Sequence, residues 1–238
     1  QTTAAAGRFD QYMYPFLARD KEEGRITDEE ALELLQCLRI KDMQLNRTSG
    51  RLLREKNAGV AKWHNWTIGG VTPDGEDATN ELSYLCLEAT RLVNSPHTNL
   101  SARLHDRTPE VFHRACFELI RTGIGFPAIF NDHVLLQGLQ EIGIPGEVGR
   151  DYCMVGCIET MLPGRQPAWS DSRFNTPLYL LRAMETLGQE QDCSYERLVA
   201  LFQAEIAEGL AAHVAQVNAH VAHFPADRFP DPFLSPLT

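Results

Sequence analysis

Apolar residues recur along this chain at two spacings, one typical of helices and one of buried strands. Thr27-Asp-Glu-Glu30 is a capping box, which predicts that a helix begins there. The residues after it are apolar at helical spacing: Ala31, Leu34, Leu35 and Leu38. Further helices are expected from Asp77 or Thr79 onward and over residues 108–123, 134–142, 174–187 and 195–221, the last capped by Ser194.

Short apolar runs bounded by Gly or Pro indicate buried strands. They occupy residues 63–68, 99–104 and 126–130, and residues 153–159 form an apolar strand or finger loop. Strands that alternate with longer helices predict an α/β fold. The pattern shows no internal repeat and no domain boundary. The Pro-rich end, from Phe224 onward, is expected to be a loop that leads into another element, so we expect a piece of a longer protein.

Composition narrows the partners of this 238-residue chain. The formal net charge of −10 argues against nucleic acid and against an anionic membrane surface. No uninterrupted apolar run approaches the ~20 residues of a membrane span. Six scattered cysteines in a chain of this size indicate reduced thiols and a cytoplasmic protein. No metal is expected, because the close pair Cys153-x3-Cys157 lacks the second Cys or His pair of a zinc site.

The strongest candidate for chemistry is Gly156-Cys157-Ile158-Glu159. Two residues is the repeat of a strand or tight loop, so the thiol and the carboxylate can face the same way. The residues around Cys157 are uncharged, which suits a neutral thiol in a dry pocket. Spacing alone also permits a thiolate nucleophile, a zinc ligand or a structural cysteine.

This element resembles the thiyl-radical loop of glycyl radical enzymes, the pyruvate formate-lyase superfamily. Other blocks that resemble the family occur in the family's order: residues 7–15, 67–70, 77–84, 99–105, 127–132 and 150–153. The resemblance implies a ten-stranded α/β barrel with the cysteine on a central finger loop. Residues 1–238 would be the central-to-late part of that barrel domain, with the N-terminal half and the glycine radical domain outside this chain.

By the same resemblance, Cys157 would abstract a hydrogen atom from substrate and Glu159 would be the general base. The cofactor would be a glycyl radical on a glycine outside this chain, installed by a radical-SAM activating enzyme. The partners would be a small-molecule substrate and a second copy in a homodimer, and neither nucleic acid nor membrane.

Features of the loop point to one branch of the superfamily. Cys157 is followed by Ile158 rather than a second cysteine, which weighs against acyl transfer to coenzyme A. Residues 164–175 resemble the glycerol dehydratase pattern, in which Asp171 would bind a substrate hydroxyl; the alternative is a helix N-cap. His64 is a second candidate substrate ligand, with a structural histidine as the alternative. Ser170 and Arg173 depart from the pattern and put a small neutral diol in doubt.

We therefore expect a glycyl radical lyase, a dehydratase of a small polyhydroxylated or hydroxy-acid substrate. The alternatives are formate acetyltransferase-type acyl transfer and another glycyl radical C–N or C–S lyase or decarboxylase. A truncated paralogue that acts as a partner subunit is the non-enzyme alternative.

Overall fold

The computed structural model describes residues 4–44, 55, 64–95, 97–165, 174–191 and 193–223. The chain divides into two units, Gln1–Ala168 with Phe233–Thr238 and Trp169–Pro232. The expected Pro-rich loop from Phe224 onward lies outside the described residues. Each unit is described by itself.

The first unit is built on a parallel sheet whose strands follow chain order, β1-β2-β3-β4. The strands are β1 (Ala4–Arg8), β2 (His64–Gly69), β3 (Asn99–Leu104) and β4 (Ala128–Asn131). Asn65 pairs with Asn99, and Thr67 pairs with Ser101. The α/β class predicted from the sequence is confirmed. The described residues supply four parallel strands and do not close a barrel.

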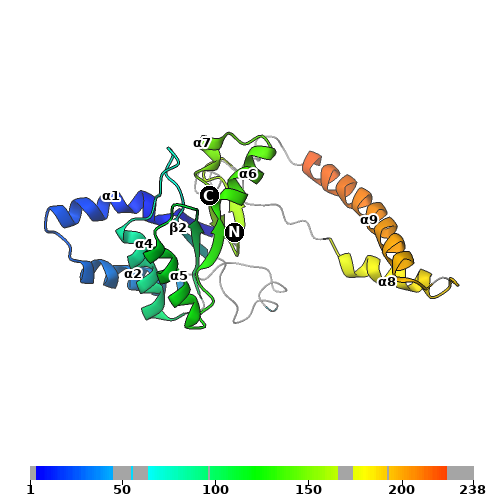
Figure 1. Ribbon diagram of the computed structural model, residues 1–238, viewed down its shortest axis with the longest axis horizontal. Coiled ribbons are helices and arrows are strands. Elements are labelled where there is room, and N and C mark those ends of the chain that lie inside the picture. Colours follow the sequence, from blue (N-terminus) through cyan, green and yellow to red (C-terminus); the bar gives the residue numbers. More distant parts are fainter. Residues whose placement is uncertain are drawn as a thin grey trace. The chain divides into compact units, whose positions relative to one another are not determined.

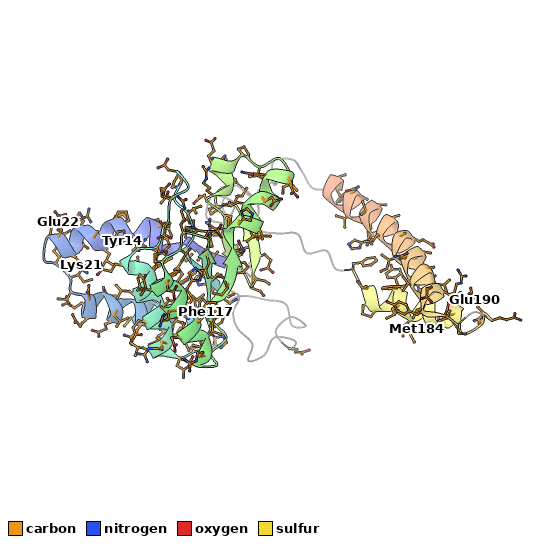
Figure 2. The ribbon with its side chains drawn as sticks, viewed as in Figure 1. Tyr14, Lys21, Glu22, Phe117, Met184 and Glu190 are labelled. Atoms are coloured by element: carbon orange, nitrogen blue, oxygen red, sulfur yellow. The ribbon has the colours of Figure 1, made fainter. Side chains whose placement is uncertain are left out.

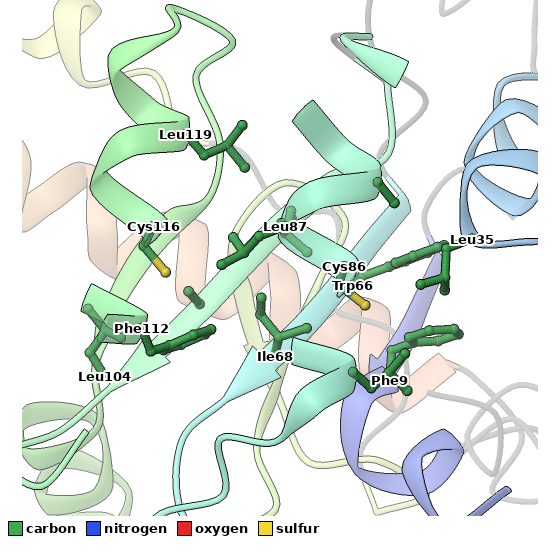
Figure 3. Packing of buried hydrophobic residues seen from close by; sticks show 14 residues of the cluster. Phe9, Leu35, Trp66, Ile68, Cys86, Leu87, Leu104, Phe112, Cys116 and Leu119 are labelled. Atoms are coloured by element: carbon green, nitrogen blue, oxygen red, sulfur yellow. The ribbon is translucent and has the colours of Figure 1, made fainter. Parts of the chain in front are cut away.

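One face of the sheet is apolar and covered by helices α1 (Phe9–Glu22), α2 (Asp28–Gln44), α4 (Glu81–Val93) and α5 (Glu110–Arg121) (Figure 1). Trp66, Ile68 and Leu104 extend from this face into the core, where Phe9 stacks on Trp66 with ring centroids 4.4 Å apart (Figure 3). Burial of each such large side chain stabilises the fold by roughly 1.5–3 kcal/mol.

The helix starts follow local hydrogen bonding. The predicted capping box is confirmed, since the N–H of Thr27 donates to Glu30 and the N–H of Glu30 donates to Thr27 Oγ1. The predicted start of α4 at Asp77 or Thr79 was wrong. Asn80 is the N-cap, because its side chain accepts from the N–H groups of Leu82 and Ser83.

The apolar stripe of α2 is narrower than its sequence pattern. Ala31 and Leu35 are buried, whereas Leu34 and Leu38 are 61% and 39% exposed. Leu34 and Leu38 instead line an open apolar groove between α1 and α2, together with Met13 and Phe16.

The other face of the sheet is polar and carries a hairpin of β5 (Cys153–Val155) and β6 (Glu159–Met161), which are antiparallel. The segment expected as a strand or finger loop is therefore a hairpin. Tyr152, Met154 and Leu162 at its base form a small core with residues on and beside α6 (Asp132–Glu141) and α7 (Gly146–Gly149). Main-chain bonding in β5–β6 thus places residues 156–158 at a tip.

The second unit is the pair α8 (Thr176–Leu187) and α9 (Tyr195–His223). The predicted cap is confirmed, since Ser194 Oγ accepts the N–H of Arg197. Most residues of α8 are exposed, among them Met184 at 52%, and Ala183 is its buried residue (Figure 2). Within the described residues, α9 alone is long and apolar enough over Tyr195–Ala219 to cross a membrane, by length and composition only. The sequence search missed it because it required a run without polar interruptions.

Candidate functional site

The tip of the hairpin is the three-residue segment Gly156-Cys157-Ile158. Val155 and Glu159 form the last strand pair beneath it. Gly156 has a φ of 62°, the left-handed conformation that glycine adopts without steric cost. Cys157 is exposed and Ile158 is 59% exposed. The dry pocket expected around the thiol is not formed by the described residues, which enclose the base of the hairpin and leave its tip uncovered.

Glu159 folds back over this tip. Its Oε2 accepts the backbone N–H of Cys157 at 2.8 Å and that of Ile158 at 3.1 Å. The strand pairing of Glu159 with Val155 places its side chain at the correct height for both bonds. The carboxylate is therefore held at the backbone of Cys157, and no hydrogen bond of Oε1 is recorded among the described residues.

Two asparagines hold the tip from the sheet side. Asn65 Nδ2 donates to the carbonyl of Cys157 at 2.9 Å. Asn99 Nδ2 donates to the carbonyl of Gly156 at 3.0 Å and to that of Cys157 at 3.2 Å. Both bonds join side chains of the sheet to the backbone of the hairpin. The sequence does contain a signal for this contact. Asn65 and Asn99 are polar residues on neighbouring strands, at positions whose side chains lie on the same face of the sheet.

The base of the hairpin is fixed by a buried ion pair. Arg103 Nε and one terminal nitrogen each donate to Asp132 at 2.8 Å, and both side chains are at most 1% exposed. The other terminal nitrogen of Arg103 donates to the carbonyl of Tyr152 at 2.7 Å. The guanidinium also stacks 3.7 Å from the Tyr152 ring centroid. Further along, Thr67 Oγ1 accepts the N–H of Met154 at 2.9 Å.

The six cysteines are thiols and divide into two groups. Cys86, Cys116 and Cys153 are buried, and burial raises the pKa of Cys153 to about 12. Cys153 therefore stays protonated and packs in the interior. Cys37 and Cys193 are exposed like Cys157, so exposure alone does not single out a reactive thiol. Cys157 differs from them in its backbone, which Glu159, Asn65 and Asn99 hold by hydrogen bonds.

Of the two candidate substrate ligands, His64 is the one that the structure describes, and it does not lie beside Cys157. His64 Nδ1 lies 2.9 Å from Asp42 Oδ2, and Trp66 Nε1 donates to the same oxygen at 3.2 Å. Because side chains alternate along β2, His64 belongs to the helix-covered face with Trp66, opposite Asn65. Asp171, with Ser170 and Arg173, lies outside the described residues. Among the described residues no cluster of three or more His, Cys, Asp or Glu side chains is suited to a metal.

A parallel α/β sheet that presents a cysteine and a glutamate on a hairpin at its polar face is the arrangement expected of glycyl radical enzymes. Residues 1–238 match the model of a protein family described as "Pyruvate formate lyase-like". The chain therefore belongs to this family, the glycyl radical enzyme superfamily.

Named relatives and solved structures agree with this assignment. The chain is 40% identical over 169 residues to isethionate sulfite-lyase of Oleidesulfovibrio alaskensis, which covers 69% of this chain and 20% of the relative. It is 35% identical over 173 residues to (2S)-3-sulfopropanediol dehydratase of Klebsiella oxytoca, covering 72% of this chain and 21% of the relative. The glycerol-bound B12-independent glycerol dehydratase from Clostridium butyricum superimposes with a TM-score of 0.84 at 32% identity, over 98% of this chain and 31% of that chain. The chain thus spans about a fifth of the curated relatives' length.

Proposed function

We propose that the protein containing this chain is a glycyl radical lyase, a dehydratase of a small polyhydroxylated or hydroxy-acid substrate. The observation that carries the proposal is the tip itself, where Glu159 is hydrogen-bonded to the backbone of Cys157. The names of the relatives, which include lyases and dehydratases, support the same class.

The residues at the tip fit a cysteine that works by hydrogen-atom transfer. Cys157 is exposed on a segment whose backbone is hydrogen-bonded on both sides, so a substrate and another loop can both approach a fixed thiol. Its neighbours Gly156 and Ile158 are uncharged, so neither stabilises a thiolate. A glycyl radical on a glycine outside this chain would supply the unpaired electron that Cys157 needs to react.

The steps assigned to this chain then balance as an elimination. The sulfur radical of Cys157 takes the hydrogen atom from the hydroxyl-bearing carbon of the substrate. Glu159 Oε1 takes the proton of that hydroxyl, while Oε2 stays on the two amides. The neighbouring C–O bond breaks, and hydroxide leaves as water with the proton from Glu159. The substrate radical recovers a hydrogen atom from the Cys157 thiol, which yields a carbonyl product and water.

A second candidate differs only in its leaving group. Isethionate sulfite-lyases from Oleidesulfovibrio alaskensis, Bilophila wadsworthia and Desulfovibrio desulfuricans are 38–41% identical over 69% of this chain. A C–S lyase would use Cys157 and Glu159 in the same first two steps and would expel sulfite in place of water. A formate acetyltransferase activity stands third, because Ile158 occupies the place of a second cysteine.

The other parts of the proposal concern the whole protein. Residues 1–238 would be the central-to-late part of a pyruvate formate-lyase-type barrel domain. A radical-SAM enzyme would activate the protein, which would be a cytoplasmic homodimer. A downstream Arg-Val-x-Gly-Tyr-like motif in the gene is expected, and its absence from a complete gene would favour the non-enzyme alternative, a truncated partner subunit.

The test is a substrate panel with the activated full-length protein under anaerobic conditions. The panel holds glycerol, propane-1,2-diol, isethionate, hydroxyproline, choline and 4-hydroxyphenylacetate, with product release as the readout. Coenzyme A-dependent exchange of formate into pyruvate tests acyl transfer. The Cys157→Ala variant should keep its glycyl radical signal by electron paramagnetic resonance and lose turnover with every compound. Turnover by that variant would overturn the proposal.

A further inference from the structure

The peptide of Cys157 is held from two opposite directions by groups of different kinds. Its N–H is bound by Glu159, which belongs to the hairpin. Its carbonyl is bound by Asn65 and Asn99, which belong to the sheet. Hydrogen bonds within the hairpin alone would fix the shape of the tip but not its position relative to the sheet. The bonds from the sheet fix that position as well.

The two asparagines are placed by strand register. Asn65 on β2 and Asn99 on β3 are direct partners in the parallel ladder. Both therefore extend from the same face of the sheet, at the same height along the strands. Their amide orientation is unambiguous, because a carbonyl oxygen accepts and cannot donate, so each Nδ2 must face the tip.

Burial makes the Asn65 bond costly to lose. Its side chain is 0% exposed, so water does not replace the Cys157 carbonyl as the acceptor for this amide. Its Oδ1 has no hydrogen-bond partner among the described residues. The bond to the Cys157 carbonyl is thus the one polar contact that the structure records for this buried amide. Asn99, which is partly exposed, adds the bond to Gly156 and shares the Cys157 carbonyl.

We propose that Asn65 and Asn99 are positioning residues that set the reach and direction of the Cys157 thiol by clamping the Gly156 and Cys157 carbonyls to the sheet. This inference rests on the proposed function. The two side chains act through the backbone of Cys157 and make no contact with substrate in this role. They should therefore affect hydrogen-atom transfer and leave substrate affinity unchanged.

The variants that test the clamp are Asn65→Asp, Asn65→Ala and Asn99→Ala in the full-length protein. Asn65→Asp keeps the shape of the side chain and replaces the donor by an oxygen that faces the Cys157 carbonyl. The matched control is Ser101→Ala. Ser101 lies on the same polar face and is equally buried, and its hydroxyl has no hydrogen-bond partner among the described residues.

The first measurement needs no radical. Hydrogen exchange of the segment 153–161, followed by mass spectrometry in the non-activated protein, should speed up severalfold in the clamp variants and not in Ser101→Ala. Exchange in α5 should stay unchanged in all variants. Unchanged exchange of 153–161 in Asn65→Asp would overturn the clamp, and so would faster exchange throughout the sheet.

The second measurement uses the activated protein with glycerol or isethionate, whichever the panel identifies. In the clamp variants kcat should fall about tenfold to a hundredfold with KM within about twofold, at equal glycyl radical content. The deuterium isotope effect on kcat, with the compound deuterated at its hydroxyl-bearing carbon, should rise. A rise in KM alone, or an isotope effect equal to that of Ser101→Ala, would contradict a positioning role. If Cys157→Ala retains turnover, the proposed function fails, and the exchange experiment still decides whether the clamp exists.

Discussion

Replacement of Asp132 by asparagine removes one partner of the buried ion pair at the base of the hairpin. Arg103 and Asp132 are 0% and 1% exposed, and two hydrogen bonds of 2.8 Å join them. In Asp132→Asn the guanidinium stays buried without a neutralising charge, and an amide NH2 faces one of its donors. Loss of one partner of a buried pair costs about 3–5 kcal/mol. The hydrogen bond that the Tyr152 hydroxyl donates to the same carboxylate is also weakened.

The control is an ion pair of the same kind at the surface. Arg114 and Glu110 on α5 are 72% and 84% exposed, and Glu110→Gln should cost at most about 0.5 kcal/mol. The double variant Arg103→Met, Asp132→Leu separates charge from hydrogen bonding. It removes both charges, yet the carbonyl of Tyr152 loses its donor, so we expect only partial recovery.

Thermal unfolding of the full-length protein compares the stabilities of these three variants. The apparent Tm should fall most in Asp132→Asn, less in the double variant and least in Glu110→Gln. If Asp132→Asn unfolds at the temperature of Glu110→Gln, the reasoning about the buried pair is refuted.

Three further predictions concern single residues. Glu159→Gln keeps an oxygen for the two tip amides and cannot take a proton, so turnover should fall by about 10²–10⁴-fold with the radical signal intact; turnover near that of the unmodified protein would remove Glu159 as the base. Gly156→Ala forces a φ of 62° on a residue with a Cβ, at a cost of roughly 1–2 kcal/mol, so faster hydrogen exchange at 153–161 is expected, and unchanged exchange would show that the turn tolerates a side chain. Burial raises the pKa of Asp10 above its ordinary 3.8, and a raised folded-state pKa means that stability is lost as pH rises from 3.8 through the folded value. The apparent Tm of Asp10→Asn should lack this pH dependence, and identical pH profiles of the two proteins would contradict the assignment.

Local patterns in the sequence predict the local structure well. The strand over residues 99–104 and the Thr27 capping box are found as predicted, because each depends on spacing within a few residues. The start of α4 was misplaced because several polar residues before it can cap a helix, and only packing selects Asn80. The tip of the hairpin was recognised from its resemblance to a family and not from its own physics.

The contacts of the site were harder to predict, because they join residues far apart in the chain. Asn65 and Cys157 are separated by 92 positions, and their contact follows from the register of β2 and from the face on which the hairpin lies. His64 is the neighbour of Asn65 in sequence and points to the opposite face, towards Asp42. Without the strand register, the sequence does not show which of the adjacent polar residues His64 and Asn65 faces the hairpin.

The buried pair of Arg103 and Asp132 and the asparagines at the tip act at opposite ends of one short hairpin. Because both ends of the hairpin are held by hydrogen bonds, its shape does not depend on the loops beside it. Under the proposed function, loops around a substrate can then differ in length and charge without moving Cys157 or Glu159. Relatives named as a sulfite-lyase and as a dehydratase would in that case share one way of holding the cysteine and the glutamate.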